Sequence, residues 1–365
     1  MKSRVFFFSA VAVLVLALLP ALYATRIQTV CSLRRITDYD DGYNLYRMNI
    51  SYDYDLSAVI RHGIRDDRDL VDAICREAFP LLPISVEVPR FGCTAFSLTD
   101  RDGQVLTGRN YDFRNDTSAL LVYCAPKDGY RSMALAALDN ISANDPERNL
   151  KTRLATLTAP FICLDGLNEK GVSIAVLTLD SEPTRQQTGK PQISTTVAIR
   201  LVLDHAATTE EAIELLRGYD MYAANGRDYQ FYITDASGNA QAVAYDLGEE
   251  RRLIAVPSQA VTNFFISYQD RVLPFRHNGV YGHGRERYDT VMRLFSEHAD
   301  DLSEAVAWEA LKASSQLPNP QDVTSNTQWS VVYNNTNLTA QIVLRRHWGD
   351  FIDCTLFSAS SSSAR

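Results

Sequence analysis

The spacing of apolar residues divides the chain into a helical first part and a longer second part of mixed structure. Leu56, Val59 and Ile60 recur three or four residues apart, and the same spacing continues through residue 79. This period is that of a helix with one buried face. Prolines within residues 80–83 then end the pattern. We therefore expect residues 40–80 to be helical, followed by an extended approach to residue 92.

From residue 92 onward, the chain changes to short apolar runs that are typical of strands. A turn sequence at residues 100–103 predicts a hairpin that pairs residues 94–99 with 104–113, and further strands are expected at 118–123 and 132–135. Helices are expected at four places, the second of which starts with a capping box of Thr208 and Glu211. Their ranges are 195–206, 208–216, 286–297 and 302–313. Two sheets, each covered by helices, would account for this order.

The N-terminus has the three parts of a secretory signal. Lys2 and Arg4 precede an almost wholly apolar run over residues 5–19, and Ala21 and Ala24 offer small residues to a peptidase. We expect residues 1–24 to be a signal peptide cleaved after Ala24, so that the protein is secreted or exported. An uncleaved membrane anchor is the alternative, because the run approaches the length of a transmembrane helix, and contact with a membrane or lipid would follow.

Composition favours an ordinary globular chain. The 365 residues are 46% hydrophobic and 22% charged, which is enough for one large core. The net charge of −8 comes without any basic cluster, so no nucleic-acid partner is expected.

Cysteine usage excludes some chemistry. No CxxC pair occurs, so a structural zinc site is not expected. No other metal and no organic cofactor is expected either. In an exported protein that keeps Cys93 free, the other five cysteines could form at most two disulfides. Those five are Cys31, Cys75, Cys124, Cys163 and Cys354.

Cys93 is the strongest candidate for a nucleophile. Most cysteines are small buried side chains with no chemical role, but this one follows Gly92 and precedes Thr94. The glycine would let the thiol approach the preceding carbonyl, because it has no side chain and tolerates strained backbone angles. Cleavage between Gly92 and Cys93 would create an α-amine with a pKa of about 7.7–8, close to working pH. One residue would then supply both nucleophile and base.

The expected hairpin also brings two charged residues towards Cys93. Its register places Arg109 and Asp112 beside the thiol. A guanidinium favours the thiolate, and a carboxylate can hold an N-terminal ammonium by charge-assisted hydrogen bonds. These neighbours favour a catalytic role for this cysteine.

Three motifs along the chain resemble the choloylglycine hydrolase and penicillin V acylase family of N-terminal-nucleophile amide hydrolases, which includes the acid ceramidase and N-acylethanolamine acid amidase branch. They are Cys93-Thr94, Gly108–Asp112 and Asp165–Gly171, and the resemblance covers about residues 90–360. It implies an α+β fold, the four-layer αββα sandwich. It also implies an autoprocessing enzyme that cleaves the linear amide bond of an N-acyl substrate through an acyl-thioester.

The resemblance assigns roles to individual residues. Arg109 and Asp112 follow the cysteine by sixteen and nineteen positions, as in the family. The implied catalytic set is Cys93, Arg109, Asp112, the oxyanion donor Asn263 and the late arginine Arg287, with autocleavage at Gly92–Cys93. Arg285 is close enough in sequence to compete for the role of Arg287. The segment Thr327–Tyr333 resembles the family's late core strand.

Two departures from the family pattern bear on the substrate. Bile-salt and penicillin enzymes have an Asn or Tyr at the acyl site, where the nearest equivalent here is Thr178. The 92 residues ahead of Cys93 are closer to the ceramidase and ethanolamidase layout with a retained N-terminal subunit. We therefore expect a helical pro-region or small subunit over 25–92, packed on a hydrolase domain over 93–365. An N-acylethanolamine or related fatty acyl amide is favoured, with bile-salt and penicillin V types left open.

Other mechanisms have weaker support in the chain. A papain-like enzyme needs a histidine base, and none of the six histidines has a recognisable catalytic setting. No GxSxG motif is present for a serine hydrolase. The alternatives that stay open are an acyltransferase with the same nucleophile and a non-catalytic secreted or membrane-anchored ligand-binding protein on the same fold.

Overall fold

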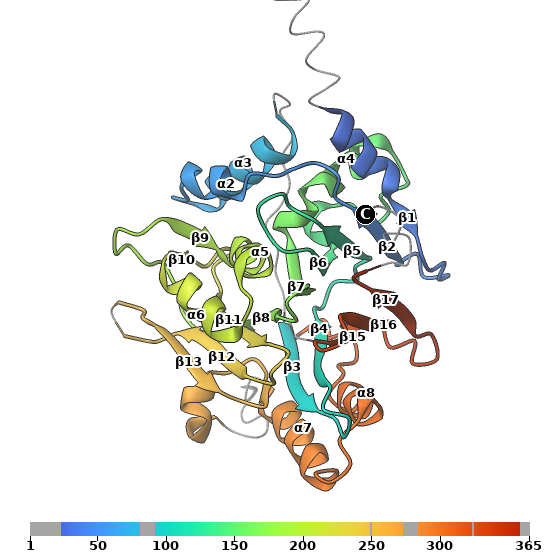
Figure 1. The fold of residues 1–365 in the computed structure, drawn as a ribbon, viewed down its shortest axis with the longest axis vertical. Helices are drawn as coiled ribbons and strands as arrows, with labels where there is room; N and C mark the ends of the chain where they lie inside the picture. The colour runs from blue at the N-terminus through green and yellow to red at the C-terminus, as the bar shows by residue number, and fades with distance from the viewer. Residues whose placement is uncertain (1–22, 81–91, 249, 273–283, 323–324, 358–365) are drawn as a thin grey trace, which may run out of the picture.

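Two stacked β-sheets form the centre of the molecule, and helices cover their outer faces (Figure 1). The structure is a computed structural model and describes residues 23–80, 92–248, 250–272, 284–322 and 325–357. The arrangement is the α+β, four-layer αββα sandwich that the sequence predicts.

The larger sheet has nine strands and is antiparallel except where β2 pairs with β5. Its middle strands consist almost wholly of buried residues, because both faces of the sheet are covered. In sheet order, the strands are β1 (Arg34–Arg35), β2 (Leu45–Asn49), β5 (Ala119–Cys124), β6 (Ser132–Ala137), β7 (Cys163–Asn168), β8 (Ser173–Leu179), β11 (Asp228–Thr234), β12 (Ala240–Tyr245) and β13 (Leu253–Pro257).

The smaller sheet has six antiparallel strands and carries the predicted hairpin. Its order is β14 (Ala260–Val261), β3 (Gly92–Thr99), β4 (Val105–Asp112), β15 (Thr327–Asn334), β16 (Thr339–Leu344) and β17 (Ile352–Thr355). Gly92 pairs with Asp112, and Cys93 pairs with Tyr111, as the predicted hairpin register requires. Gly108 of the second motif is needed for packing, since an added Cβ would lie 2.2 Å from the ring of Phe96.

The four predicted helices are confirmed, two on each sheet. On the nine-stranded sheet lie α5 (Thr195–His205) and α6 (Thr209–Arg217), next to the small sheet of β9 (Gln192–Ser194) and β10 (Asp220–Tyr222). Thr208 caps α6 as predicted, by accepting from the backbone of Glu211. On the six-stranded sheet lie α7 (Arg285–Glu297) and α8 (Glu304–Ala313). Short helices downstream of Cys93 are α4 (Leu150–Ala155), η1 (Leu138–Ile141), η2 (Thr156–Phe161) and η3 (Ile266–Arg271).

The segment upstream of Cys93 is less helical than predicted. It contains α2 (Leu56–His62), α3 (Asp67–Ala78) and a further helix over residues 23–32, but Leu45–Asn49 forms strand β2. The helical prediction for residues 40–80 was wrong there, because Leu45 and Met48 are three positions apart, a spacing that a helix also shows. β2 lies inside the nine-stranded sheet, so the upstream segment contributes to the main core. Its separation as a domain over 25–92 stays a prediction.

Two predictions about export depend on features at the chain's N-terminus and on its cysteines. Residues 1–22, which carry most of the predicted signal peptide or anchor, lie outside the described residues. Within the described part of the chain, no helix has the length and apolarity to cross a membrane. All six cysteines are free, so neither of the two disulfides that the sequence would allow is formed.

Truncation of a buried β2 side chain should destabilise the whole protein. Leu45 is fully buried, so we expect Leu45→Ala to lower the free energy of unfolding by about 2–4 kcal/mol. Chemical denaturation followed by circular dichroism measures this loss. Leu150→Ala is the matched control, because Leu150 is 69% exposed and its truncation should change little. Equal effects of the two substitutions would mean that the upstream segment is not part of the main core.

Candidate active site around Cys93

Cys93 lies near the start of β3 and is completely buried. It belongs to the core between the sheets, whereas Phe96 of the same strand packs under α7 and α8. The backbone N–H of Cys93 donates to Oδ1 of Asn263 at 3.2 Å, and its carbonyl accepts from Arg287 at 2.8 Å. Both main-chain polar groups of the candidate nucleophile are therefore held by predicted site residues.

Arg287 connects the other predicted residues of the site. From α7, its Nη1 donates to the carbonyl of Cys93 and, at 2.6 Å, to the hydroxyl of Thr94, and it lies 3.4 Å from a carboxylate oxygen of Asp112. Its Nη2 donates to Oδ1 of Asn263 at 2.7 Å. The side chain is almost wholly buried. One guanidinium thus fixes the positions of Cys93, Asp112 and Asn263.

The start of α7 explains why Arg287, and not Arg285, reaches the site. Gly284 caps the helix with a φ of +84°, and an added Cβ there would lie 2.4 Å from Nη2 of Arg287. A glycine is therefore needed both for the backbone angle and for the close approach of the guanidinium. Arg285 turns away and pairs with Asp289 at 2.8 Å. The sequence had left open which of the two arginines reaches the site.

Arg109 reaches across from β4 to a carboxylate on the facing sheet. Its Nε donates to Asp165 of β7 at 3.2 Å, and both side chains are fully buried. Asp165 also accepts hydrogen bonds from Trp329, at 3.1 Å, and from the hydroxyl of Tyr333. Nη1 and Nη2 of Arg109 have no hydrogen-bond partner among the described atoms. The guanidinium is anchored at one end and keeps its other donors free near the thiol, whose pKa its charge lowers.

Asp112 is held on its other side by the late strand. The hydroxyl of Thr327 donates to Oδ1 of Asp112 at 2.6 Å. Arg346 in turn donates to the carbonyl of Thr327 at 2.8 Å and to Oδ1 of Asn326 at 3.2 Å. Arg345, Arg346 and Asn326 all have left-handed backbone angles, with φ of 44°, 65° and 65°. Such strain in residues other than glycine persists only where the surroundings enforce it.

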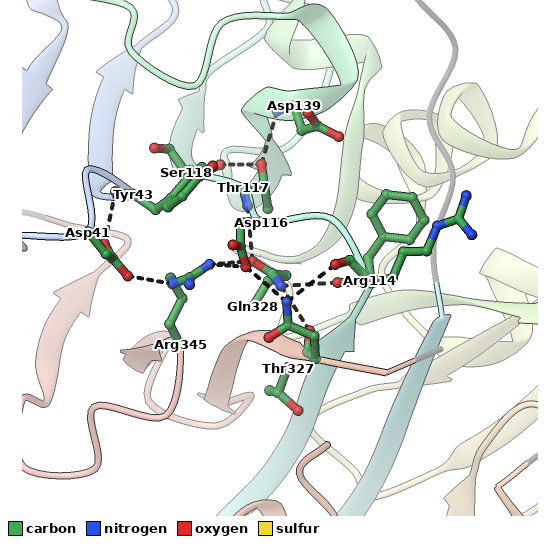
Figure 2. A network of polar contacts seen from close by, with 12 residues as sticks. Asp41, Tyr43, Arg114, Asp116, Thr117, Ser118, Asp139, Thr327, Gln328 and Arg345 are labelled. Atoms are coloured by element: carbon green, nitrogen blue, oxygen red, sulfur yellow. Dashed lines mark hydrogen bonds and ion pairs between the residues drawn. The ribbon is translucent and has the colours of Figure 1, made fainter. Parts of the chain in front are cut away.

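The turn at Arg345 and Arg346 also joins the upstream segment to the region around Asp112. Figure 2 shows Arg345 between two carboxylates, Asp41 from the turn between β1 and β2 at 2.9 Å and Asp116 at 2.6 Å. Arg345 also donates to Gln328, which lies next to Thr327. Residues before and after the candidate cleavage bond therefore share one polar network (Figure 2).

Asn263 and Thr178 form a second link between the sheets. Nδ2 of Asn263 donates to the main-chain carbonyl of Thr178 at 2.8 Å. The Thr178 side chain is buried and donates to the carbonyl of Asp228 at 3.4 Å. Asn263 therefore lies beside Cys93 as predicted, but in this uncut chain its amide nitrogen is occupied. Thr178 adjoins the site through its backbone, and its role in substrate binding stays a prediction.

Burial sets the protonation states of the two central groups. It raises the pKa of the Cys93 thiol to about 12, against the lowering effect of Arg109. It also raises the pKa of Asp112 to about 6, against the lowering effects of Arg287 and of the hydrogen bond from Thr327. In the uncut chain the thiol is therefore protonated near neutral pH and needs a base before it can attack.

Two of the histidines that the structure describes contact residues outside the candidate site. His298 lies 3.8 Å from Glu309, and His347 stacks on Tyr39. His277 and His283 lie outside the described residues. No cluster of three potential metal ligands occurs among the residues that the structure describes.

The sequence missed several residues that position this site. Asp165 belongs to a motif that carries the family resemblance, and Thr327 begins the predicted late strand, yet neither had been given a role. Arg346 and Gly284 lie outside every motif. Their contacts depend on tertiary structure, which a one-dimensional pattern does not contain.

Comparison with known proteins supports the resemblance. Residues 93–249 match the family of linear amide C–N hydrolases, choloylglycine hydrolase family, and the match begins at Cys93. The fold is similar to that of penicillin V acylase from Agrobacterium tumefaciens, at 19% identity over 69% of this chain and 83% of that one, with a TM-score of 0.51. It is also similar to a mutant conjugated bile acid hydrolase from Clostridium perfringens, at 15% identity over 72% of this chain and 92% of that one, with a TM-score of 0.52. No curated protein has a matching sequence.

Removal of the Thr327 hydroxyl should shift the titration of Asp112. Its hydrogen bond lowers the pKa of Asp112 by stabilising the charged form. In Thr327→Val, we therefore expect the Asp112 carboxyl to titrate above its present value of about 6, whereas Thr327→Ser should keep that value. Carbon-13 NMR of labelled aspartate in the uncut Cys93→Ala chain measures the pKa. If the pKa of Asp112 is the same in Cys93→Ala alone and with Thr327→Val or Thr327→Ser added, the role given to Thr327 is contradicted.

Loss of the charge on Asp165 should destabilise the protein. Asp165→Asn leaves the buried Arg109 guanidinium without its counter-charge, which costs roughly 3–5 kcal/mol. Denaturant unfolding measures the loss. Glu214→Gln is the control, because Glu214 pairs with Arg217 on the exposed surface, where ion pairs contribute little. An Asp165→Asn protein as stable as the wild type would show that the pair across the sheets is not needed.

Proposed function

We propose that this chain, whose residues 93–249 belong to the choloylglycine hydrolase family of linear amide C–N hydrolases, cleaves an N-acyl substrate through a thioester on Cys93. One observation carries the proposal: a buried cysteine directly after a glycine has both its main-chain N–H and its carbonyl held by site residues. A buried structural cysteine also needs partners for its main-chain groups, but it does not need them to be an asparagine and a buried arginine that also contacts Asp112.

Self-cleavage comes first in this proposal. The thiol of Cys93 attacks the carbonyl of Gly92, and its proton passes to the main-chain nitrogen of Cys93 as that nitrogen leaves, which gives a thioester. Water then hydrolyses the thioester, so that Gly92 ends in a carboxylate and Cys93 begins a new chain. The product has an α-amine with a pKa of about 7.7–8. In the reaction with substrate that follows, this amine is the base for the Cys93 thiol.

Substrate hydrolysis uses the same atoms. The α-amine takes the thiol proton, the thiolate attacks the amide carbonyl, and the leaving amine departs with a proton. Water then releases the acyl group as a carboxylic acid and restores the thiol. Asp112 holds the α-ammonium, and Arg109 and Arg287 keep the site electropositive. Asn263 donates to the oxyanion once its amide leaves the Thr178 carbonyl, a contribution on the order of 10²–10³ in rate for one donor.

The upstream segment stays bound after cleavage in this proposal. β2 is paired on both sides within the nine-stranded sheet, and Asp41 is tied to Arg345. This retained small subunit favours an N-acylethanolamine or related fatty acyl amide over bile-salt and penicillin V types. With the basic and apolar N-terminus, it also supports export of the protein. The ligand-binding alternative is not adopted, because the family is one of hydrolases.

Hydrolysis of an amide panel tests the proposal. We expect wild-type protein to release amine from N-acylethanolamines, whereas Cys93→Ala should lose at least about 10³-fold in kcat/KM, since no nucleophile remains. Cys93→Ser is the closest control, because it keeps the shape of the side chain and replaces only the thiol with a hydroxyl. An acyl adduct trapped on the peptide that begins with Cys93 would confirm the thioester. A Cys93→Ala protein with wild-type activity would overturn the proposal.

A further inference from the structure

Asn263 lies in a bend just beyond the end of β14. The register of β14 on β3 ends at Val261, which pairs with Ala95. Thr262 and Phe264, the residues on either side of Asn263, are buried, and buried main-chain carbonyls need donors even where strand pairing has stopped. The position of Asn263 therefore depends on groups that come from another part of the fold.

Gln230 of β11 supplies the donors for these carbonyls. Its Nε2 donates to the carbonyl of Thr262 at 2.6 Å and to that of Phe264 at 3.0 Å. The two protons of one carboxamide thus serve both neighbours of Asn263. Gln230 is completely buried, and its Oε1 has no hydrogen-bond partner among the described atoms. An apolar side chain of similar size would avoid the cost of that acceptor, but it could not hold the two carbonyls.

The strand next to β11 holds the side chain of the same asparagine. Gln230 pairs with Leu177 of β8, and the carbonyl of the following residue, Thr178, accepts from Nδ2 of Asn263 at 2.8 Å. β11 therefore fixes the main chain around Asn263, and β8 fixes its carboxamide. When Nδ2 leaves the Thr178 carbonyl for an oxyanion, the contacts with Gln230 still keep the main chain in place.

Thr262 connects Gln230 to the start of α7. Its carbonyl accepts from Gln230, and its hydroxyl donates to the carbonyl of Gly284 at 3.0 Å. Gly284 caps the helix that bears Arg287, and Arg287 donates to Oδ1 of Asn263 at 2.7 Å. The main chain before Asn263 and the arginine that holds its side chain are thus tied to one another.

We infer that Gln230 is the positioning residue of the oxyanion donor Asn263. The inference rests on the proposed function and adds a residue of the facing sheet that acts only through Asn263. Gln230 holds the main chain on both sides, so that the Asn263 carboxamide rotates from the Thr178 carbonyl to the oxyanion while its Cα stays in place. Without these bonds the donor is misplaced, and a displacement of about 1 Å can cost on the order of 10² in rate.

The uncut Cys93→Ala chain tests the inference without any turnover. Nitrogen-15 NMR of labelled asparagine follows the side-chain amide of Asn263, whose signal is identified by its loss in Asn263→Ser. Addition of Gln230→Met removes both donors and keeps a similar volume. We expect the Asn263 signal to shift and its hydrogen exchange to become about tenfold faster or more, because the segment opens more easily. An unchanged Asn263 signal would overturn the inference.

Tyr232→Phe is the matched control. Tyr232 lies two positions along β11 and therefore on the same face as Gln230, and its hydroxyl is 2.9 Å from the carbonyls of Ser258 and Gln259. Its loss removes a donor to the same segment, but before β14 and not beside Asn263. The Asn263 signal should stay as it is. If Tyr232→Phe moves the signal as much as Gln230→Met does, the effect is a general loosening and the inference is wrong.

The processed enzyme supplies the second test. Gln230→Met should lower kcat and kcat/KM for an N-acyl amide by the same factor, about 10–100-fold, because an oxyanion contact is made only in the transition state. In an Asn263→Ala background the same substitution should have no further effect, since the donor that it positions is gone. Tyr232→Phe should keep wild-type kinetics. Additive losses from Gln230→Met and Asn263→Ala would contradict the inference.

Gln230→Glu replaces the methionine variant if that variant does not fold. Burial would raise the pKa of the introduced carboxyl. While protonated, this carboxyl keeps one donor, and once ionised it has none, so kcat should fall as pH rises through that pKa. A pH profile of Gln230→Glu that matches the wild type would contradict the inference. Failure of the proposed function would appear differently, as a shifted Asn263 signal in the uncut chain with no hydrolysis of any amide.

Discussion

The site depends on the hydrogen bonds of one buried guanidinium. Arg287 brings together the carbonyl of Cys93, the carboxylate of Asp112 and the amide oxygen of Asn263, which come from three separate parts of the chain. A buried charge is tolerated only where its partners compensate for lost hydration. Two features of the fold therefore serve this one side chain. The β3–β4 register places its partners Cys93 and Asp112, and the glycine before α7 leaves room for its guanidinium.

A second buried arginine, between the two sheets, is also compensated by its partners. Arg109 and Asp165 face each other from opposite sheets, and Trp329 and Tyr333 supply the remaining hydrogen bonds to the carboxylate. The arrangement leaves donors of Arg109 unpaired inside the core, which is costly for stability and useful for an anionic reaction centre. The strained turn at Arg345 and Arg346 adds contacts between the site and the surface of the molecule. It links the upstream segment to the strand that holds Asp112.

The sequence predicted the parts of the fold that local patterns encode. The hairpin, its turn and the four main helices follow from the apolar period and from the residues that begin or end each element. Strand β2 was missed because the three-residue spacing of Leu45 and Met48 also fits a helix, and the pairing of β2 with β5 is a contact between distant parts of the chain. The predicted site residues come together, but the supporting contacts of Asp165, Thr327, Arg346 and Gly284 could not be predicted. Asp165 and Thr327 contact residues 56 and 215 positions away, Arg346 contacts residues 19 and 20 positions away, and Gly284 leaves room for the guanidinium of Arg287.

Identification of the first residue of the mature large subunit tests the account most directly. Intact mass and N-terminal sequencing of the purified full-length protein should show a fragment that begins at Cys93 and contains 273 of the 365 residues, about three quarters of the 40.9 kDa chain. The smaller upstream fragment should elute with it from a sizing column, since β2 lies within the sheet. A single uncut chain at both neutral and acidic pH would contradict the assignment of Cys93 as an N-terminal nucleophile.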